Sequence, residues 1–214
     1  MHTNTTRMMS VVEKPINISS SGEIMMKYAP IAALAALFLT GHEAFAQNQT
    51  TLFDGSNLDG WITSGDANWS LVDGGAVEAS SGGGHLISEN SYSDFILSLE
   101  FWVDDPANSG VFIRCADPDE VSPNSCYEIN IFDQREDQTY RTGSIVFFAA
   151  PAVHINAGGQ WNSYEIRAEG SRLLVTLNGM VTVDMEDETY SEGQLTLQYG
   201  GGLVRFRNVQ IQTL

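Results

Sequence analysis

Apolar residues at every second position are the feature that most constrains this chain. In residues 94–103 the alternating set is Phe95, Leu97, Leu99, Phe101 and Val103. Successive side chains of a strand point to opposite faces, so this period predicts a strand with one buried face. Similar alternation recurs over 161–170, 171–185, 193–200 and 203–214, and no sustained helical period or repeat occurs. The pattern predicts an all-β sandwich of two antiparallel sheets.

Turn signals separate these segments. Asn178-Gly179 interrupts the alternation of 171–185, and this dipeptide is the strongest short-range signal of a hairpin. Glycine clusters at 82–84 and 200–202 mark further turns. The order strand, turn, strand therefore extends over most of the chain after residue 47.

The N-terminal region is typical of an exported protein. Residues 26–46 combine Lys27, a short apolar core and small residues at Ala44 and Ala46, which predicts a signal peptide cleaved before Gln47. The apolar core is too short to span a bilayer, so no stable membrane insertion is expected after cleavage. Residues 1–25 are polar and unpatterned, and we expect a mis-assigned or disordered extension with the true start at Met25 or Met26. The expected product is a single secreted or periplasmic domain, 47–214.

Charge narrows the range of partners. The formal net charge is −17, and no lysine follows Lys27. Such a surface repels nucleic acids and anionic membranes, which excludes them as expected partners. An acidic surface suits a saline habitat or loosely held divalent cations; the loop carboxylates Asp117, Asp119 and Glu120 leave a weak calcium site open, although no EF-hand spacing supports one.

Two cysteines, Cys115 and Cys126, stand in the segment FIRCADPDEVSPNSCYEINIFD, residues 112–133. In an exported protein such a pair is expected to form a disulfide, which stabilises by roughly 2–3 kcal/mol in the chain-entropy model. Two thiols without a nearby histidine make a poor metal site, and His85 and His154 have no metal-ligand spacing. The sequence therefore predicts a structural staple and no metal centre.

An ordered set of motifs resembles one known family. It consists of LFDGSNLDGW (52–61), NWSLVDGGAV (68–77), GGGHLISENSYSDFILSLEFWV (82–103), NSGVFIR (108–114), YEINIFD (127–133), TGS (142–144), GQWNSYEIRAEGSRLLVTLNG (159–179) and GQLTLQYGGGLVRFRNVQI (193–211). In this order and spacing they resemble the 3-keto-disaccharide hydrolase domain. The resemblance implies a concanavalin A-like jelly roll with a carbohydrate site on its concave sheet, and hydrolysis of 3-keto-glycosides.

The chemistry implied by this resemblance requires a base near sugar C2 and a hydrogen-bonding or positive group near the C3 oxygen. A ketone at C3 acidifies the C2 hydrogen, so no carboxylate pair of the ordinary glycosidase type is needed. Glu128 is the candidate base and Arg114 the candidate cation, since a hairpin across the stapled loop would make them neighbours. A plain cross-strand ion pair remains the alternative.

Further polar residues on the expected site face are candidates for binding substrate: Glu100, Trp102, Asn130, Gln198 and Arg207. Trp102 has a flat aromatic face that fits a pyranose, and the amides of Asn130 and Gln198 suit sugar hydroxyls. Ordinary sheet packing for Trp102 and simple solvent exposure for the amides stay open. For Arg205 and Arg207 the simpler expectation is that each pairs with an adjacent carboxylate.

Three positions differ from the usual pattern of this family. Members usually carry glutamine where this chain has Asn130, a histidine at the position of Tyr199 and a tyrosine near Val146. The leading hypothesis is an exported hydrolase or lyase acting on 3-keto-glycosides. A carbohydrate-binding module without catalysis and a structural envelope protein are the alternatives.

Overall fold

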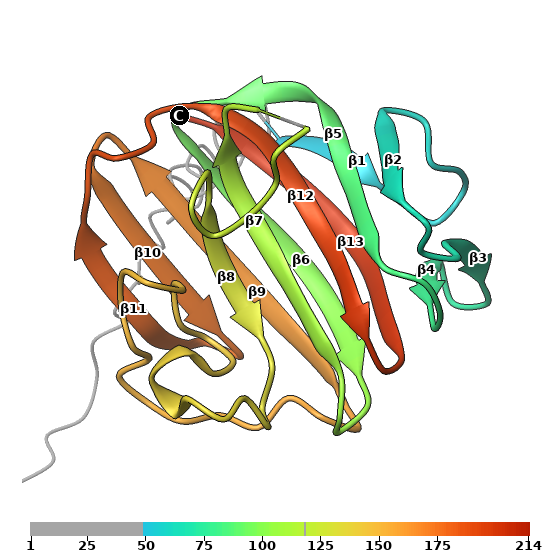
Figure 1. Ribbon diagram of the computed structural model, residues 1–214. Coiled ribbons are helices and arrows are strands. Elements are labelled where there is room, and N and C mark those ends of the chain that lie inside the picture. The colour runs from blue at the N-terminus through green and yellow to red at the C-terminus, as the bar shows by residue number, and fades with distance from the viewer. Residues whose placement is uncertain (1–48, 118) are drawn as a thin grey trace, which may run out of the picture. The chain divides into compact units, whose positions relative to one another are not determined.

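Two stacked antiparallel sheets make up residues 49–117 and 119–214 of the computed structural model, the part of the chain that it describes (Figure 1). The predicted extension 1–25 and signal segment 26–46 lie outside the described residues. Apart from a 3-10 turn, Gln138–Tyr140, the regular elements are all strands, and no helix in this part is long and apolar enough to cross a membrane. The predicted all-β jelly-roll class is confirmed.

Strand pairing defines the two sheets. Sheet A consists, in spatial order, of β11 (Met180–Glu186), β10 (Arg172–Leu177), β9 (Trp161–Glu169), β6 (Phe95–Val103), β13 (Val204–Thr213), β4 (Ala76–Ala79) and β3 (Ser70–Val72), with β1 (Gln49–Phe53) also paired to β13. Sheet B consists of β2 (Trp61–Gly65), β5 (Gly84–Tyr92), β12 (Gly193–Gly201), β7 (Asn108–Cys115) and β8 (Tyr127–Ile131).

The core lies between the sheets, where the period-two pattern places it. Every second residue of β6, from Phe95 to Val103, is buried, which confirms the predicted face. Phe101 stacks on Tyr164 of the neighbouring strand with ring centroids 4.9 Å apart. Sheet B contributes Val111 and Ile129 to the same cluster. Each such side chain stabilises the fold by about 1.5–3 kcal/mol relative to an exposed one.

The predicted hairpin at Asn178-Gly179 joins β10 to β11. Both residues have positive φ, 51° and 77°. A two-residue turn with this pair of signs matches the right-handed twist of the flanking strands, and asparagine and glycine tolerate it best. The prediction is therefore confirmed.

A β-bulge interrupts β7 at Arg114. Thr196 of β12 pairs with Phe112, while Gln194 pairs with Cys115, so one residue of β12 opposes two of β7. Arg114 has a φ of 55°, in the left-handed region. A bulge adds a residue to one strand and reverses the alternation beyond it. Cys115 consequently lies on the same face as Phe112, and the side chain of Arg114 leaves that face.

Candidate active site

Two cross-strand rows of side chains occupy the face of sheet B that points away from sheet A, here called the outer face of sheet B. One row is Ser64, His85, Gln198, Gly110 and Asn130. The next row, two residues along each strand, is Ile62, Ile87, Thr196, Phe112 and Glu128. Directly opposed residues of neighbouring strands lie within side-chain contact. In the view of Figure 1 this sheet lies in front of sheet A.

Glu128 is the titratable group at the end of the second row. Its neighbours in sequence, Tyr127 and Ile129, belong to the core, so the alternation turns Glu128 to the outer face of sheet B. The side chain is nevertheless only 6% exposed. Burial raises the pKa of Glu128 to about 7, and the positive charge of Arg135 opposes this increase. A carboxylate with such a pKa can accept a proton near neutral pH.

Gly110 lies between this carboxylate and the amide of Gln198. A Cβ atom built on Gly110 would lie 3.3 Å from Oε1 of Glu128 and 3.4 Å from Oε1 of Gln198. The glycine therefore forms a floor with a carboxylate on one side and an amide on the other. A close approach of a ligand to the backbone is a common reason for a glycine inside a strand.

Four buried polar atoms at this part of sheet B have no hydrogen-bond partner among the described residues: His85 Nε2, Asn130 Oδ1, Ser144 Oγ and Gln198 Oε1. An unsatisfied buried polar group costs about 1–3 kcal/mol, so each such group calls for an explanation. Three of the four belong to the row that contains Gly110. Of the four, His85 and Gln198 belong to partly exposed side chains, and a ligand rich in hydroxyl groups can satisfy these two, because hydroxyls both donate and accept.

His85 is held in a fixed position in this row. Its ring meets the edge of Phe112 at a centroid distance of 5.7 Å and an interplanar angle of 90°. Burial lowers the pKa of His85, so the imidazole is neutral at pH 7 and one of its nitrogens can accept a hydrogen bond.

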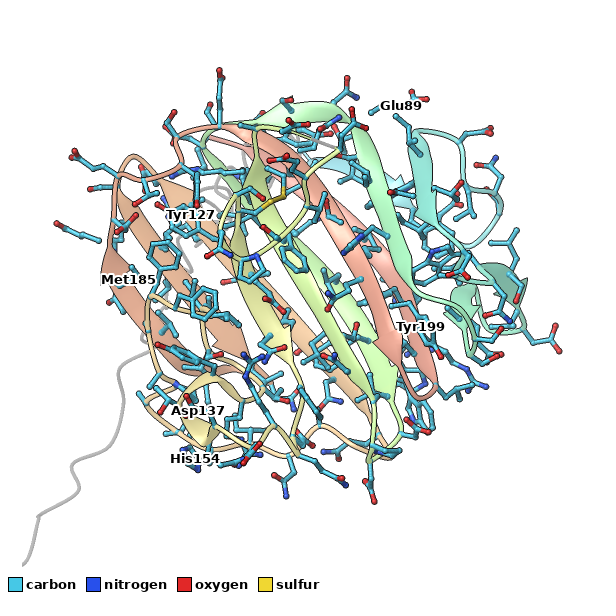
Figure 2. The ribbon with its side chains drawn as sticks, in the orientation of Figure 1. Glu89, Tyr127, Asp137, His154, Met185 and Tyr199 are labelled. Atoms are coloured by element: carbon cyan, nitrogen blue, oxygen red, sulfur yellow. A yellow bond between two sulfur atoms is a disulfide. The ribbon has the colours of Figure 1, made fainter. Side chains whose placement is uncertain are left out.

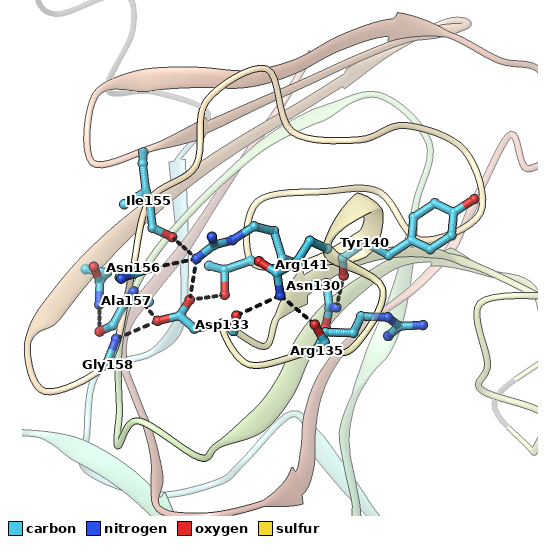
Figure 3. A network of polar contacts seen from close by, with 12 residues as sticks. Asn130, Asp133, Arg135, Tyr140, Arg141, Ile155, Asn156, Ala157 and Gly158 are labelled. Atoms are coloured by element: carbon cyan, nitrogen blue, oxygen red, sulfur yellow. Dashed lines mark hydrogen bonds and ion pairs between the residues drawn. The ribbon is translucent and has the colours of Figure 1, made fainter.

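The loop that follows β8 brings Arg135 to Glu128. Asp133 accepts hydrogen bonds from the backbone nitrogens of Ala157, at 2.7 Å, and Gly158, at 3.1 Å, and fixes the start of this loop (Figure 3). Arg135 then lies near enough to lower the pKa of Glu128. Its guanidinium also lies 5.8 Å from the centroid of the Tyr140 ring. The cation beside Glu128 is therefore Arg135, which the sequence analysis did not single out.

Arg114 does not approach Glu128, contrary to the expected pairing. Its side chain is 1% exposed and donates to the carbonyls of Ser93, Gly170 and Tyr190 at 2.8–3.1 Å. A further contact joins it to Asp94 at 3.2 Å. The expectation was wrong because the bulge reverses the side-chain alternation just before Cys115. Arg114 instead ties together three turns at one end of the sandwich.

The disulfide between Cys115 and Cys126 forms as predicted. Both sulfurs pack in a small apolar cluster with Phe112 and Val121. The staple therefore fixes the loop of residues 116–125 beside the second row of the site; in Figure 2 it is the yellow bond near the labelled Tyr127. Within that loop Asp117 accepts a hydrogen bond from the backbone nitrogen of Asp119 at 2.9 Å, which gives this carboxylate a role in a turn.

The remaining predicted residues divide between the two sheets. Asn130 and Gln198 lie in the first row of sheet B, on the same face as Glu128. Glu100, Trp102 and Arg207 instead point to solvent from the opposite side of the molecule, on strands β6 and β13 of sheet A. The period of two gives two faces for each strand but does not say to which sheet the strand belongs, and this is why the expectation grouped them wrongly.

Ion pairs occupy the charged groups of this second surface, the outer face of sheet A. Arg207 contacts Glu100 at 2.6 Å and Arg205 contacts Glu78 at 2.7 Å, as the simpler expectation for the two arginines had it. Arg205 also covers the ring of Trp102 at 5.2 Å. A shallow groove of about 590 Å³ lies on the same face. Of its two carboxylates, Glu100 is paired with Arg207 and Glu165 is exposed to solvent, so we do not take this groove as the site.

Two of the three positions that differ from the usual family pattern lie at the site. Asn130 is in the first row, and Val146 donates its backbone N–H to the carbonyl of Glu128 at 3.0 Å. Tyr199 instead belongs to the core and donates its hydroxyl proton to the carbonyl of Gly202 at 2.9 Å. The substitution at Tyr199 therefore does not alter the outer face of sheet B.

Some of the site residues that the sequence analysis did not single out had a recognisable sequence pattern, and others had none. Gly110 interrupts an apolar strand, and His85 alternates with buried Leu86, so both patterns pointed to a special role on one face. Arg135 stands in a loop without periodicity, where sequence alone gives no direction to a side chain.

Comparisons with known proteins give a family and two curated relatives. The model of the 3-keto-alpha-glucoside-1,2-lyase-like domain matches residues 48–212. A 3-keto-disaccharide hydrolase of Bacteroides thetaiotaomicron is 26% identical, and the match covers 69% of this chain and 61% of that protein. The chain thus spans less than two thirds of the length of the curated relatives that it matches.

Solved structures show the same fold. A predicted glycosyl hydrolase from Parabacteroides distasonis superimposes with a TM-score of 0.71 at 20% identity, over 81% of this chain and 97% of that one. The carbohydrate-binding module CBM66 from Bacillus subtilis superimposes with a TM-score of 0.58 at 22% identity, over 72% and 96%. At these identities the likeness establishes the architecture alone.

Proposed function

The chain belongs to the 3-keto-alpha-glucoside-1,2-lyase-like domain family, and from this premise we propose that it cleaves 3-keto-glycosides by elimination followed by addition of water. The observation that carries the proposal is Glu128, a buried carboxyl with a pKa of about 7 beside Gly110. The similar 3-keto-disaccharide hydrolase supports the substrate class.

Glu128 acts as the base in this proposal. Its carboxylate takes the proton from C2, which the neighbouring ketone has made acidic, and the electrons of the C–H bond form an enolate. The enolate then expels the C1 oxygen, which takes the proton from Glu128 as it leaves, so that the C1–O bond breaks and a C1–C2 double bond forms. Water adds across this double bond, its oxygen to C1 and a proton to C2, and the net reaction is hydrolysis. A pKa near the working pH suits such a proton transfer.

Arg135 stabilises the negative charge that develops on the C3 oxygen. A guanidinium beside a site of low dielectric stabilises an enolate more strongly than it would in water. Arg114, the cation expected from the sequence, does not enter the proposal, because its donors are engaged with Ser93, Gly170 and Tyr190. The proposed pair is therefore Glu128 and Arg135.

The first row binds the sugar ring. We place the 3-keto ring over Gly110, which has no side chain of its own, with Gln198 and Asn130 at its hydroxyls. His85, neutral at pH 7, accepts a hydrogen bond from one of them. This arrangement gives partners to His85 Nε2 and Gln198 Oε1, which have none among the described residues.

The test compares a 3-keto-disaccharide with its unoxidised parent, both incubated with the full chain. The proposal expects release of two monosaccharide units from the keto form only, because the parent lacks an acidic C2 hydrogen. Equal cleavage of the parent would refute the enolate route. Binding of either sugar without cleavage would refute catalysis.

A carbohydrate-binding module is the second candidate function. The likeness in fold to CBM66 favours it, and a row of polar atoms beside a glycine floor suits binding without chemistry as well. The two candidates differ in one measurable respect. A module binds the sugar whether residue 128 is Glu or Gln, whereas the enzyme loses turnover with that change.

Export is part of the proposal. The segment 26–46 has the features of a signal peptide, and the disulfide Cys115–Cys126 suits an oxidising compartment. N-terminal sequencing of periplasmic or secreted material should begin near Gln47. Recovery of residues before Met25 in that fraction would contradict both the cleavage and the proposed start of translation.

A further inference from the structure

Phe147 combines a strained backbone with an exposed ring. Its φ is 71°, in the left-handed region that bulky side chains rarely adopt. The side chain is 53% exposed. Strained residues of this kind persist where the surrounding structure holds them, and they cluster at binding and catalytic sites.

Packing does not account for Phe147. The next residue, Phe148, meets the core residue Tyr127 edge to face at 4.9 Å and also contacts Tyr190. Phe148 thus supplies the apolar anchor of this segment. Phe147 meets only the ring of Tyr140 among the aromatic contacts of the described residues, edge to face at 5.7 Å. Its exposure and its strain therefore require another reason.

Site residues hold this aromatic pair in place. Asn130 of the first row donates a side-chain hydrogen bond to the carbonyl of Tyr140 (Figure 3). On the other side, the residue before Phe147 is Val146, whose backbone N–H is bound by the carbonyl of Glu128. The guanidinium of Arg135 lies over the Tyr140 ring, 5.8 Å from its centroid. The pair, called here the aromatic shelf, is therefore fixed to the two strand positions that carry the proposed chemistry.

We propose that the aromatic shelf, Phe147 and Tyr140, binds the second sugar unit of a disaccharide, the unit that leaves from C1. This inference rests on the proposed function, which places the keto ring over Gly110. The shelf lies beyond Glu128, on the side away from Gln198 and His85, because the segment 144–146 follows the free edge of β8. C1 adjoins the C2 atom that Glu128 deprotonates, so the group on C1 extends toward the shelf.

The chemistry of the shelf fits a sugar. The flat face of an aromatic ring packs against the C–H groups of a pyranose, while the rim of the ring stays in water. A monosaccharide glycoside with a small group on C1 would not reach the shelf.

The experiment measures binding by calorimetry in a Glu128→Gln background, so that no turnover occurs. The probes are 3-keto-trehalose and methyl 3-keto-α-glucoside, which share the keto ring and differ in the group on C1. Phe147→Ala is expected to lower the affinity for the disaccharide about tenfold and to leave the affinity for the methyl glycoside unchanged. Phe147→Trp should restore most of the loss.

Two further variants separate binding from folding. Phe147→Gly relieves the strain at φ 71° and should raise the melting temperature while it weakens disaccharide binding in the same way. Trp161→Ala is the matched control, because Trp161 is an exposed aromatic on the outer face of sheet A, 36% exposed. It should leave both affinities unchanged.

Three outcomes would overturn the shelf: undiminished disaccharide binding by Phe147→Ala, an equal loss for both probes, or an equal loss in the Trp161→Ala control. The failure of the proposed function is distinguishable. Wild-type protein that shows shelf-dependent binding without turnover would refute catalysis and leave the shelf intact, whereas normal turnover with normal binding by the Phe147 variants would refute the shelf alone.

Discussion

The two outer faces of the sandwich differ in the burial and pairing of their polar side chains. On sheet A the charged side chains are partly exposed and paired, as with Arg207 and Glu100. On sheet B, Glu128 is almost fully buried without an ion pair among the described residues, and the amide oxygen of Gln198 has no partner there. Paired charges on a solvent-exposed surface need no explanation beyond solubility. Buried groups without partners carry a cost in free energy that folding alone does not justify, and this contrast supports our proposal of a site on sheet B.

The largest expected effect tests the two glutamates against each other. Glu128→Gln keeps shape and most hydrogen bonding but removes the base, so turnover of a 3-keto-disaccharide should fall by about 10²–10⁴. Glu100→Gln removes a carboxylate from the opposite face and should leave turnover within about twofold. Steady-state kinetics on both variants checks this. Equal losses of turnover in the two variants would contradict a functional difference between the two faces.

The two arginines provide a stability contrast. Arg114→Lys replaces a planar fork that donates to three buried carbonyls, and we expect the free energy of unfolding to fall by about 3 kcal/mol. Arg207→Lys alters a partly exposed ion pair and should cost less than about 1 kcal/mol. Denaturant unfolding measures both. The folded Arg114→Lys protein should keep its turnover number. A loss of turnover without a loss of stability would show that Arg114 belongs to the active site.

The raised pKa of Glu128 makes stability depend on pH in a stated direction. The folded pKa of about 7 exceeds the ordinary value of 4.5, so the favourable contribution is complete below about pH 4.5 and is lost as the pH rises through 7. The difference corresponds to roughly 3 kcal/mol as an upper value. Glu128→Gln should therefore be more stable than wild type at pH 8.5, and this advantage should vanish at pH 4.5. Unfolding curves at the two pH values check this; an advantage that does not change between them would contradict it.

The smallest effect concerns the glycine floor. Gly110→Ala would place a methyl group against Glu128 and Gln198 at 3.3–3.4 Å, and we expect kcat/KM to fall about tenfold through weaker substrate binding. Gly83→Ala is the matched control, since its nearest neighbour would lie 4.0 Å away. Steady-state kinetics on the two glycine variants measures this difference in kcat/KM. A harmless Gly110→Ala would show that no ligand approaches this part of the sheet.

Much of the fold was predictable because local patterns express it directly. The alternation of β6, the hairpin at Asn178-Gly179 and the pairing of Cys115 with Cys126 each depend on short-range or compartment chemistry. Glu128 and Asn130 were also expected to share one face of their strand, and they do. Arg114 was predicted on the wrong face because a single left-handed residue reverses the side-chain alternation. No neighbouring residue in the sequence predicts such a bulge.

Long-range relations limited the rest of the site prediction. Glu100 and Trp102 alternate as site residues would, but sheet membership depends on pairing across the whole chain. Arg135 and Phe147 lie in the segment between β8 and β9, where a polar network around Asp133 decides the course of the backbone. Such a network requires contacts between residues far apart in sequence, and periodicity does not encode it.

The most direct test of the account is a pH titration of Glu128, monitored by carbon NMR of its side-chain carboxyl. The carboxyl signal is assigned by its disappearance in Glu128→Gln. The account predicts a transition near pH 7, because the carboxyl is buried on a face built for a ligand and only partly compensated by Arg135. A transition near 4.5, the ordinary value, would show a solvated carboxylate and would contradict the assignment of Glu128 as the base.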